Sequence, residues 1–152
     1  MASPDWLDET EMRIWRSFLA ASQSVLQSID AGLKADASLT LDDYEVLVHL
    51  SEEPTRRLRM SELSERLLHS RSRLTQRIDR MERKGLVTRE KCGDDARGTW
   101  AVLTDDGWST IVRAAPAHLA EVRRALIDRI PDADRAALAD ILTRLATPPA
   151  DD

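Results

Sequence analysis

The sequence predicts a mainly α-helical fold that contains a helix-turn-helix followed by a β-hairpin. Three observations support this prediction. Apolar residues recur every three to four positions over most of the chain, which is typical of amphipathic helices. Two of the predicted helices, 61–68 and 70–84, follow each other across a tight turn. Directly after the second helix, over residues 86–103, apolar residues alternate with polar ones on either side of a turn-rich loop, which indicates a β-hairpin.

The composition suits one folded domain with a helical extension. The chain has 152 residues, of which 42% are hydrophobic and 32% charged, enough apolar material for a core and too much for a disordered chain. No apolar run approaches the roughly 18 residues that span a membrane, and we recognise no signal peptide. The single Cys92 cannot form an internal disulfide. We therefore expect a cytoplasmic protein.

The first predicted helix is long and amphipathic. Apolar residues recur at helical spacing over residues 6–33, and Gly32 lies close to the predicted end. Residues 34–39 form a short connection. Thr40 then begins a second helix, in which Asp43 completes a pattern like a capping box.

The third predicted helix is short and leads into the turn. Pro54 ends the second helix, and residues 58–60 are a candidate for a very short strand. Ser61 is expected to cap the third helix, which ends near Leu68.

The fourth predicted helix has an apolar back and a basic front. Ser70 is its expected N-cap and Gly85 its expected C-terminal stop. Leu74, Ile78 and Met81 form one narrow apolar stripe. Polar and basic residues occupy the rest of the helix, with Ser72, Arg73, Gln76, Arg80 and Arg83 opposite the stripe and Thr75 and Arg77 on its flanks.

The net charge of −5 hides an uneven distribution. Residues 68–91 carry eight basic and three acidic side chains, so this segment has a charge of +5 and the remainder of the chain −10. A basic segment on an acidic body is typical of a DNA-binding face on an otherwise soluble protein.

In a helix-turn-helix the second helix enters the major groove with its N-terminal residues first, and the tip of a following hairpin reaches the neighbouring minor groove. We therefore expect Arg73, Gln76 and Arg77 to contact bases and phosphates. Arg80, Arg83 and Lys84 lie farther along the helix and are expected to steer or touch the DNA backbone, or to pair with Asp79 and Glu82. The full predicted DNA-binding set adds phosphate contacts, the minor-groove residue Arg97 and the residue Asp95 that braces the tip: Ser70, Arg71, Ser72, Arg73, Thr75, Gln76, Arg77, Arg80, Arg89, Lys91, Asp95 and Arg97.

Taken in order, four segments resemble the MarR family of bacterial transcription regulators over nearly the whole chain. They are SRLTQRIDRME at 72–82, KGLVTR at 84–89, DAR at 95–97 and LTDDG at 103–107. The resemblance implies a recognition helix at 70–84, a wing at 92–99 and a homodimer in which the first, fifth and sixth helices interlock. It also implies a pseudo-palindromic operator and often a small-molecule ligand that releases the DNA.

The last two predicted helices support the dimer independently. A fifth helix begins at residue 104 with an apolar stripe that runs to Ile130, and a sixth follows Pro131. With the first helix, these stripes are too many to bury against the small winged unit alone. We expect residues 1–39 and 108–152 to form the dimerisation region and residues 40–107 the DNA-binding domain. The expected interface residues are Leu7, Ile14, Leu126, Ile130, Leu138, Ile141, Leu142 and Leu145.

An effector site is expected from the resemblance alone. The resemblance implies a pocket between the dimer helices and the winged unit, where Trp15, Phe18, Tyr44, His49 and Trp108 are candidates for its lining. Each of them also suits an ordinary core or interface position.

No metal site, cofactor or enzymatic chemistry is predicted. The three histidines and Cys92 are far apart in sequence, and no phosphate loop or nucleophile elbow is present. Cys92 lies beside Lys91, so an oxidant-sensing thiolate remains an alternative. We expect a repressor. The main alternative is a winged-helix protein–protein interaction module without DNA binding, which the excess of arginine on residues 70–84 disfavours.

Overall fold

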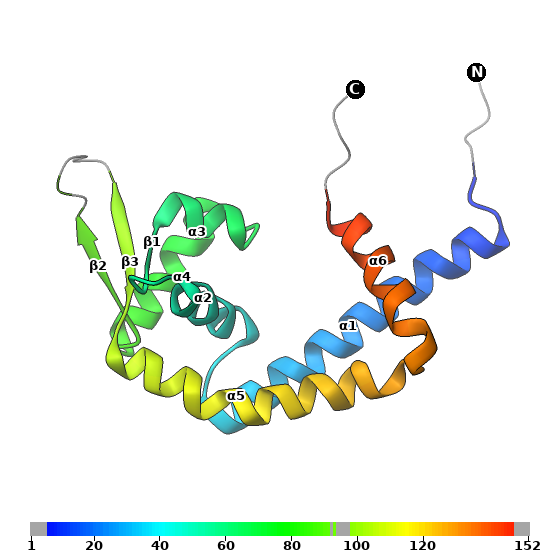
Figure 1. The fold of residues 1–152 in the computed structure, drawn as a ribbon. Coiled ribbons are helices and arrows are strands. Elements are labelled where there is room, and N and C mark those ends of the chain that lie inside the picture. Colours follow the sequence, from blue (N-terminus) through cyan, green and yellow to red (C-terminus); the bar gives the residue numbers. More distant parts are fainter. Residues whose placement is uncertain (1–5, 92, 94–97, 148–152) are drawn as a thin grey trace, which may run out of the picture.

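The computed structural model describes residues 6–91, 93 and 98–147, and its helices and strands confirm a mainly α-helical chain with a small sheet (Figure 1). Helices α1 and α5 pack along each other and carry at one end a unit of three helices and the sheet. The elements are α1 (Glu9–Ala37), α2 (Leu41–Glu52), β1 (Arg57–Arg59), α3 (Met60–Arg66), α4 (Arg71–Arg83), β2 (Val87–Lys91), β3 (Thr99–Leu103), α5 (Asp105–Ala125), the 3₁₀ turns η1 (Ile127–Arg129) and η2 (Asp132–Asp134), and α6 (Arg135–Ala146).

The winged unit, α2 through β3, is a helix-turn-helix backed by an antiparallel sheet with strand order β1-β3-β2. The predicted hairpin is confirmed, with Val87 opposite Leu103 and Lys91 opposite Thr99. The short strand β1 lies one residue earlier than predicted and pairs Leu58 with Ala101.

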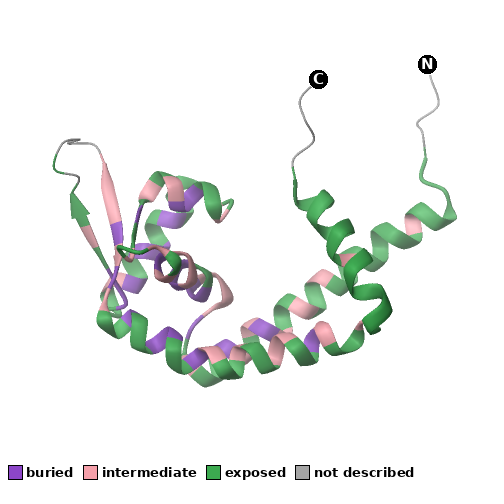
Figure 2. Cartoon of the chain, viewed as in Figure 1, coloured by how far each residue is buried: buried purple, intermediate pink, exposed green. Residues whose placement is uncertain are grey.

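The core of the protein lies inside the winged unit and where that unit meets α1 and α5 (Figure 2). Its apolar side chains come from every helix and strand of the unit, so the unit closes around its own residues. The fully buried ones include Val46, Leu47, Leu50, Leu63, Ile78, Met81, Val87 and Ala101.

Local capping signals fix several helix ends of the winged unit as predicted. Thr40 Oγ1 accepts from the Asp43 amide at 3.1 Å, and the Asp43 carboxylate accepts from the Thr40 amide at 3.4 Å, which completes the capping box. Ser70 accepts from the Arg73 amide at 3.3 Å. Gly85 has φ +73° and donates to the Glu82 carbonyl, as in a Schellman motif, so the stop predicted at this glycine is confirmed.

Two predicted helix ends are wrong. Helix α1 continues past Gly32 to Ala37 and ends where Ser38 adopts a left-handed conformation. Buried Leu33, just after the glycine, holds the extra turn against the core. Helix α3 begins at Met60, with Arg59 as its N-cap, so Ser61 lies within the first turn and does not cap it.

The fifth helix also ends earlier than predicted. Helix α5 stops at Ala125, and the chain passes through η1 and η2 before α6 begins at Arg135. The apolar stripe that the sequence shows as far as Ile130 is therefore divided between a helix and a 3₁₀ turn.

Helix α6 and the N-terminal half of α1 leave their apolar side chains exposed (Figure 2). None of the residues of α6 is buried. Together the two helices line a groove of about 970 Å³, here called the α1–α6 groove, in which Ile14 is 64% and Leu145 67% exposed. Across the described residues, no helix is long and apolar enough to cross a membrane.

Candidate nucleic-acid interface

Helix α4 presents a polar and basic surface because its apolar side is fully used by the core. Leu74, Ile78 and Met81 are at most 1% exposed, and their burial fixes the orientation of the helix about its own axis. The predicted front is therefore outward. The exposed polar and basic residues of this front, including the N-cap, are Ser70, Arg71, Ser72, Arg73, Thr75, Gln76, Arg80 and Arg83.

Arg73 lies on this exposed side of α4, and one nitrogen of its guanidinium contacts α2. Its side chain is 59% exposed, and its Nη2 lies 3.0 Å from Asp42 Oδ2 of α2. Thr75 Oγ1 donates to the Arg71 carbonyl at 2.8 Å within the helix. An exposed guanidinium with one carboxylate contact retains N–H donors for another acceptor.

Arg77 does not lie on the exposed flank where the sequence placed it. Its side chain is only 7% exposed and points between α4 and α2. Its Nη1 donates to Asp43 Oδ1 at 2.7 Å and to Thr40 Oγ1 at 3.2 Å, and its Nη2 pairs with Asp42. The spacing contained a signal, because position 77 is three residues after Leu74 and four before Met81, on the buried side.

Arg89 is likewise committed within the protein. It pairs with Asp79 at 2.6 Å and with Glu82 at 2.8 Å, and its Nη2 donates to the Thr75 carbonyl at 3.1 Å. Asp79 and Glu82 of α4 therefore pair with Arg89 of strand β2, whereas the sequence offered pairing with bases of their own helix as one alternative. Arg77 and Arg89 together tie α4 to α2 and to the hairpin.

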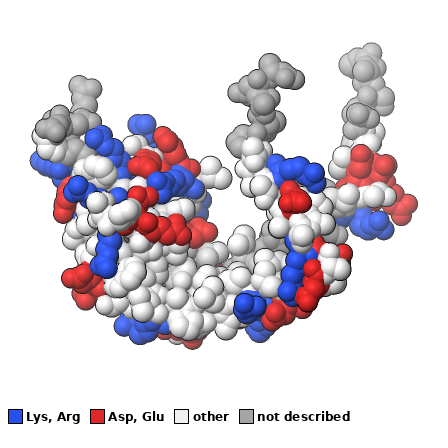
Figure 3. Space-filling view, viewed as in Figure 1, with Lys and Arg blue, Asp and Glu red and all other residues white. Residues whose placement is uncertain are grey.

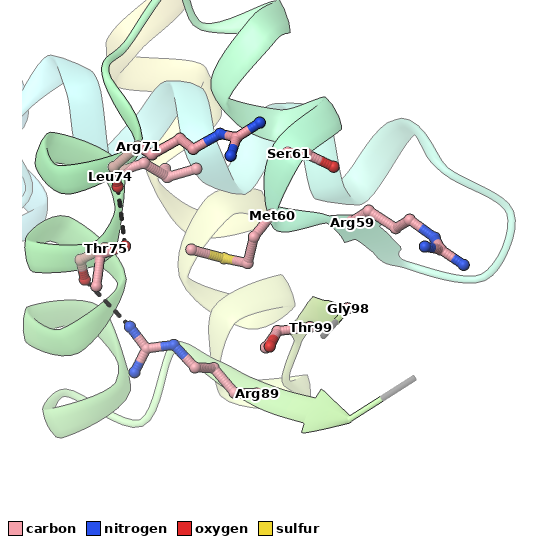
Figure 4. Close-up of a pocket in the computed structure, with 9 residues that line it drawn as sticks. All are labelled: Arg59, Met60, Ser61, Arg71, Leu74, Thr75, Arg89, Gly98 and Thr99. Carbon is pink, nitrogen blue, oxygen red and sulfur yellow. Dashed lines mark hydrogen bonds between the residues drawn. The ribbon is translucent and has the colours of Figure 1, made fainter. Parts of the chain in front are cut away.

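A polar cavity of about 410 Å³, here called the wing groove, separates α4 from the hairpin. In Figure 4, Arg71 extends from α4 toward Ser61, Arg89 extends from β2 toward Thr75, and Arg59 points outward from β1. The groove is lined by Arg59, Met60, Ser61, Arg71, Leu74, Thr75, Arg89, Gly98 and Thr99.

Charge on the winged unit is mixed. Figure 3 shows basic and acidic side chains side by side over this end of the molecule. Lys91 is exposed at the end of β2. Three predicted site residues, Asp95 and Arg97 of the wing and Cys92 of the redox alternative, lie outside the described residues.

The five candidate effector residues do not line one cavity. Trp15 and Phe18 stack on α1, with ring centroids 6.4 Å apart, at the α1–α6 groove. The other three lie elsewhere. Tyr44 is buried in the winged unit, and His49 is half-buried on α2. Trp108 lies on α5, and the guanidinium carbon of Arg56 lies 4.4 Å from its ring centroid.

Tyr44 packs against His118 of α5, with ring centroids 4.3 Å apart. Burial raises the pKa of the Tyr44 hydroxyl and lowers the pKa of the His118 imidazole. Nδ1 of His118 is buried and has no hydrogen-bond partner among the described residues. In that part of the chain, no three His, Cys, Asp or Glu side chains are placed to hold a metal ion.

The comparisons with known proteins agree with this geometry. A model of the MarR family matches residues 37–98. Sco3205, a MarR family transcriptional regulator from Streptomyces coelicolor solved in complex with DNA, is 38% identical with a TM-score of 0.91, over 96% of this chain and 91% of that one. The chain belongs to the MarR family. As a member it is a DNA-binding transcriptional regulator and not an enzyme.

Two further relatives support the assignment to the MarR family. AbsC, also a MarR family regulator from Streptomyces coelicolor, is 41% identical with a TM-score of 0.88, over 93% of this chain and 95% of that one. The HTH-type transcriptional regulator YkoM of Bacillus subtilis is 29% identical over 124 residues, 82% of this chain and 79% of that protein.

Proposed function

We propose that this MarR family regulator is a repressor that binds a pseudo-palindromic operator as a homodimer. In this account the N-terminal half of α4 enters the major groove. The observation that carries the proposal is the fixed orientation of α4 about its axis. Its apolar side is buried, and Arg73 and Gln76 are exposed on the opposite side. Arginine and glutamine are the side chains that recognise guanine and adenine edges there.

The roles within the set differ. Arg73 and Gln76 contact bases, and Ser70, Arg71, Ser72 and Thr75 contact phosphates around them. Arg80 steers the approach or touches the backbone. The buried pairing of Arg77 and the three-way pairing of Arg89 make these two arginines positioning residues rather than DNA contacts.

In this proposal the wing of each subunit adds contacts to the DNA beside the major groove. Lys91 contributes to phosphate binding at the base of the wing, Arg97 enters the minor groove beside the recognition helix, and Asp95 braces the loop that carries it. This part of the proposal rests on the sequence of the loop and on its place after β2.

The α1–α6 groove is where we place the second copy of the chain. The groove is lined by apolar side chains, Leu7, Ile14, Leu138, Ile141 and Leu142 among others, and a contiguous apolar surface of this kind can mark a protein–protein interface. A two-fold partner would bury it and space two recognition helices about 34 Å apart, one turn of DNA. Trp15 and Phe18 belong to the same surface, so a small apolar effector that entered there would alter that spacing and release the operator.

The experiment begins with selection of duplexes from a randomised library by the full-length protein, followed by fluorescence anisotropy on the selected duplex. Arg73→Ala should weaken binding at least about fivefold and lower the preference over a scrambled duplex, because the variant no longer reaches a base edge. Arg83→Ala is the matched control, an exposed arginine at the other end of α4. A reporter whose promoter carries the selected site should be silenced by the protein.

Two outcomes would contradict the proposal. One is a wild-type protein that binds no duplex at 50 mM salt. The other is an equal effect of Arg73→Ala and Arg83→Ala on affinity and on sequence preference, because α4 would then have no end that reads bases.

A further inference from the structure

Asp42 of helix α2 connects a buried arginine of α4 with an exposed one. Its Oδ2 accepts from Nη2 of Arg77, whose side chain is 7% exposed, and from Nη2 of Arg73 at 3.0 Å, whose side chain is 59% exposed. The other terminal nitrogen of Arg77, Nη1, donates to Asp43 at 2.7 Å. Asp42 therefore lies where the buried ion pairs end and the proposed base-reading surface begins.

The Asp42 carboxylate is fixed from within the protein. It lies in the first turn of α2, where unpaired amide groups stabilise a negative charge, and the start of that helix is set by the capping box of Thr40 and Asp43. Arg77 holds the carboxylate from the buried side. Because α2 and α4 both pack into the core, the position of Asp42 is set before any DNA is bound.

The contact with Asp42 restricts Arg73 and leaves it with free donors. An exposed arginine otherwise samples many rotamers, and the loss of that freedom opposes binding. Asp42 engages Nη2 of Arg73, whereas Nε and Nη1 have no partner among the described residues. Bidentate recognition of a guanine edge needs the planar guanidinium in one orientation, with two N–H donors directed at the base. An arginine that Asp42 has already oriented loses less entropy when it binds.

His69, in the turn before α4, does not displace Arg73 from this carboxylate. Its Nδ1 is buried and has no hydrogen-bond partner among the described residues. Burial first, and then the positive charge of Arg73, lower the pKa of the imidazole, although the negative charge of Asp42 opposes this shift. The imidazole is therefore neutral at pH 7 and leaves Asp42 to the two arginines.

We propose that Asp42 is a specificity-determining positioning residue, which holds the Arg73 guanidinium in the orientation that contacts a base edge. This inference rests on the proposed function and adds a residue of α2 to it. Asp42 precedes Arg73 by 31 positions, so no local pattern in the sequence connects them. A carboxylate near DNA repels the phosphates of any duplex, so its contribution is to sequence preference rather than to affinity.

The first test compares Asp42→Asn with wild type by fluorescence anisotropy, on the selected duplex and on a scrambled one, at 50 mM salt. Affinity for the scrambled duplex should stay the same or rise, because a negative charge has been removed. Affinity for the selected duplex should fall relative to it, so that the ratio of the two affinities decreases about threefold or more. The decrease should not exceed that of Arg73→Ala.

The second test asks whether Asp42 acts through Arg73. In an Arg73→Ala background, Asp42→Asn should leave the ratio of affinities unchanged, because the side chain that Asp42 orients is already absent. Asp42 also pairs with Arg77, and a role limited to the packing of α4 would instead lower the ratio in both backgrounds. The double variant therefore distinguishes a positioning residue from a structural one.

Glu45→Gln is the matched control for charge. Glu45 is an exposed acid of the same helix and has no ion pair in the part of the chain that the structure describes, so its removal should leave the ratio at the wild-type value. Thermal unfolding followed by circular dichroism checks each variant. If Asp42→Asn is unfolded, Asp42→Glu replaces it, because glutamate keeps the charge beside Arg77 and displaces the carboxylate by one methylene group. The same decrease in the ratio is expected.

The outcomes separate this inference from the proposed function. An unchanged ratio in Asp42→Asn, while Arg73→Ala lowers it, would overturn the role of Asp42 and leave the proposed function standing. An equal decrease in the ratio with and without Arg73 would also overturn it, as would an equal loss of affinity for both duplexes. No binding by the wild type to any duplex would instead contradict the proposed function.

Discussion

The two ends of the molecule use the same amphipathic pattern and reach opposite results. In the winged unit, Leu47 of α2 and Ile78 of α4 are fully buried by their own chain. At the other end, Ile14 and Leu145 have the same helical spacing and are 64% and 67% exposed. Periodicity identifies the apolar side of a helix, but it does not identify what covers that side. We infer that the winged unit is complete in one chain and that the α1–α6 end is completed by a second.

A charge placed in the α1–α6 groove tests most strongly whether this end of the molecule is covered by a second chain. Leu142→Asp should abolish association at micromolar concentration, because a carboxylate would be buried in an apolar interface. DNA affinity should then fall by about a hundredfold or more, since two linked half-sites become one. Sedimentation equilibrium measures the first effect and anisotropy the second.

Gln27→Arg is the control for the charged groove, because it lies on α1 and does not line the groove. Equal association of Leu142→Asp and wild type would contradict a dimer built on this groove.

The same comparison predicts that changes inside the winged unit alter stability rather than association. Arg77→Ala leaves the buried Asp43 without its closest partner, so the free energy of unfolding should fall by about 3 kcal/mol. Arg80→Ala, an exposed arginine of the same helix, should change it by less than about 0.5 kcal/mol. Urea unfolding measures both, and similar values for the two variants would remove Arg77 from its positioning role.

The next largest effect on stability is expected at Gly107, where the backbone of α5 lies very close to Leu86 and Leu103. A Cβ at Gly107 would lie 2.2 Å from the Leu86 carbonyl oxygen and 2.7 Å from Leu103 Cδ1, so Gly107→Ala should destabilise the protein by about 2 kcal/mol. At Gly32 the nearest atom is the flexible Glu121 side chain at 3.4 Å, and Gly32→Ala in the interior of α1 should stabilise by about 0.5 kcal/mol. If urea unfolding showed that both variants change the free energy of unfolding in the same direction, this contrast would be contradicted.

The smallest predicted effect lies at the junction of the two regions. Burial holds the pKa of His118 below the ordinary value of 6.5, so the unfolded chain binds its proton at a higher pH than the folded protein does. Stability should therefore decrease as the pH falls below about 6.5, and His118→Gln should reduce that decrease. Melting temperatures from pH 7.5 to 5 measure it, and an identical pH dependence in the variant would exclude His118 as a source.

Local signals in the sequence were sufficient for several element boundaries of the winged unit. The capping box of Thr40 and Asp43, the N-cap Ser70 and the stop at Gly85 each depend on residues within a few positions, and each is confirmed. The hairpin follows from a change of period. Such features are determined before tertiary packing is considered, which is why a single sequence contains them.

The errors arose where distant residues decide the structure. Gly32 suggests a helix end, yet α1 continues because Leu33 is buried against elements remote in sequence. Arg77 was expected on an exposed flank of the helix because its acidic partners are 34 and 35 residues earlier, outside any local pattern. The cavity between α4 and the hairpin could not be predicted, because it exists only once these two elements are packed together. Charge on a helix therefore indicates a binding surface, and tertiary pairing decides which charges remain available to it.

The most direct test of the central claim is the stoichiometry of the complex with DNA. Sedimentation equilibrium of the full-length protein with a labelled selected duplex should give the mass of the duplex plus two chains of 17.1 kDa. A saturated complex with one chain per duplex would contradict the claim that the α1–α6 groove is completed by a second copy.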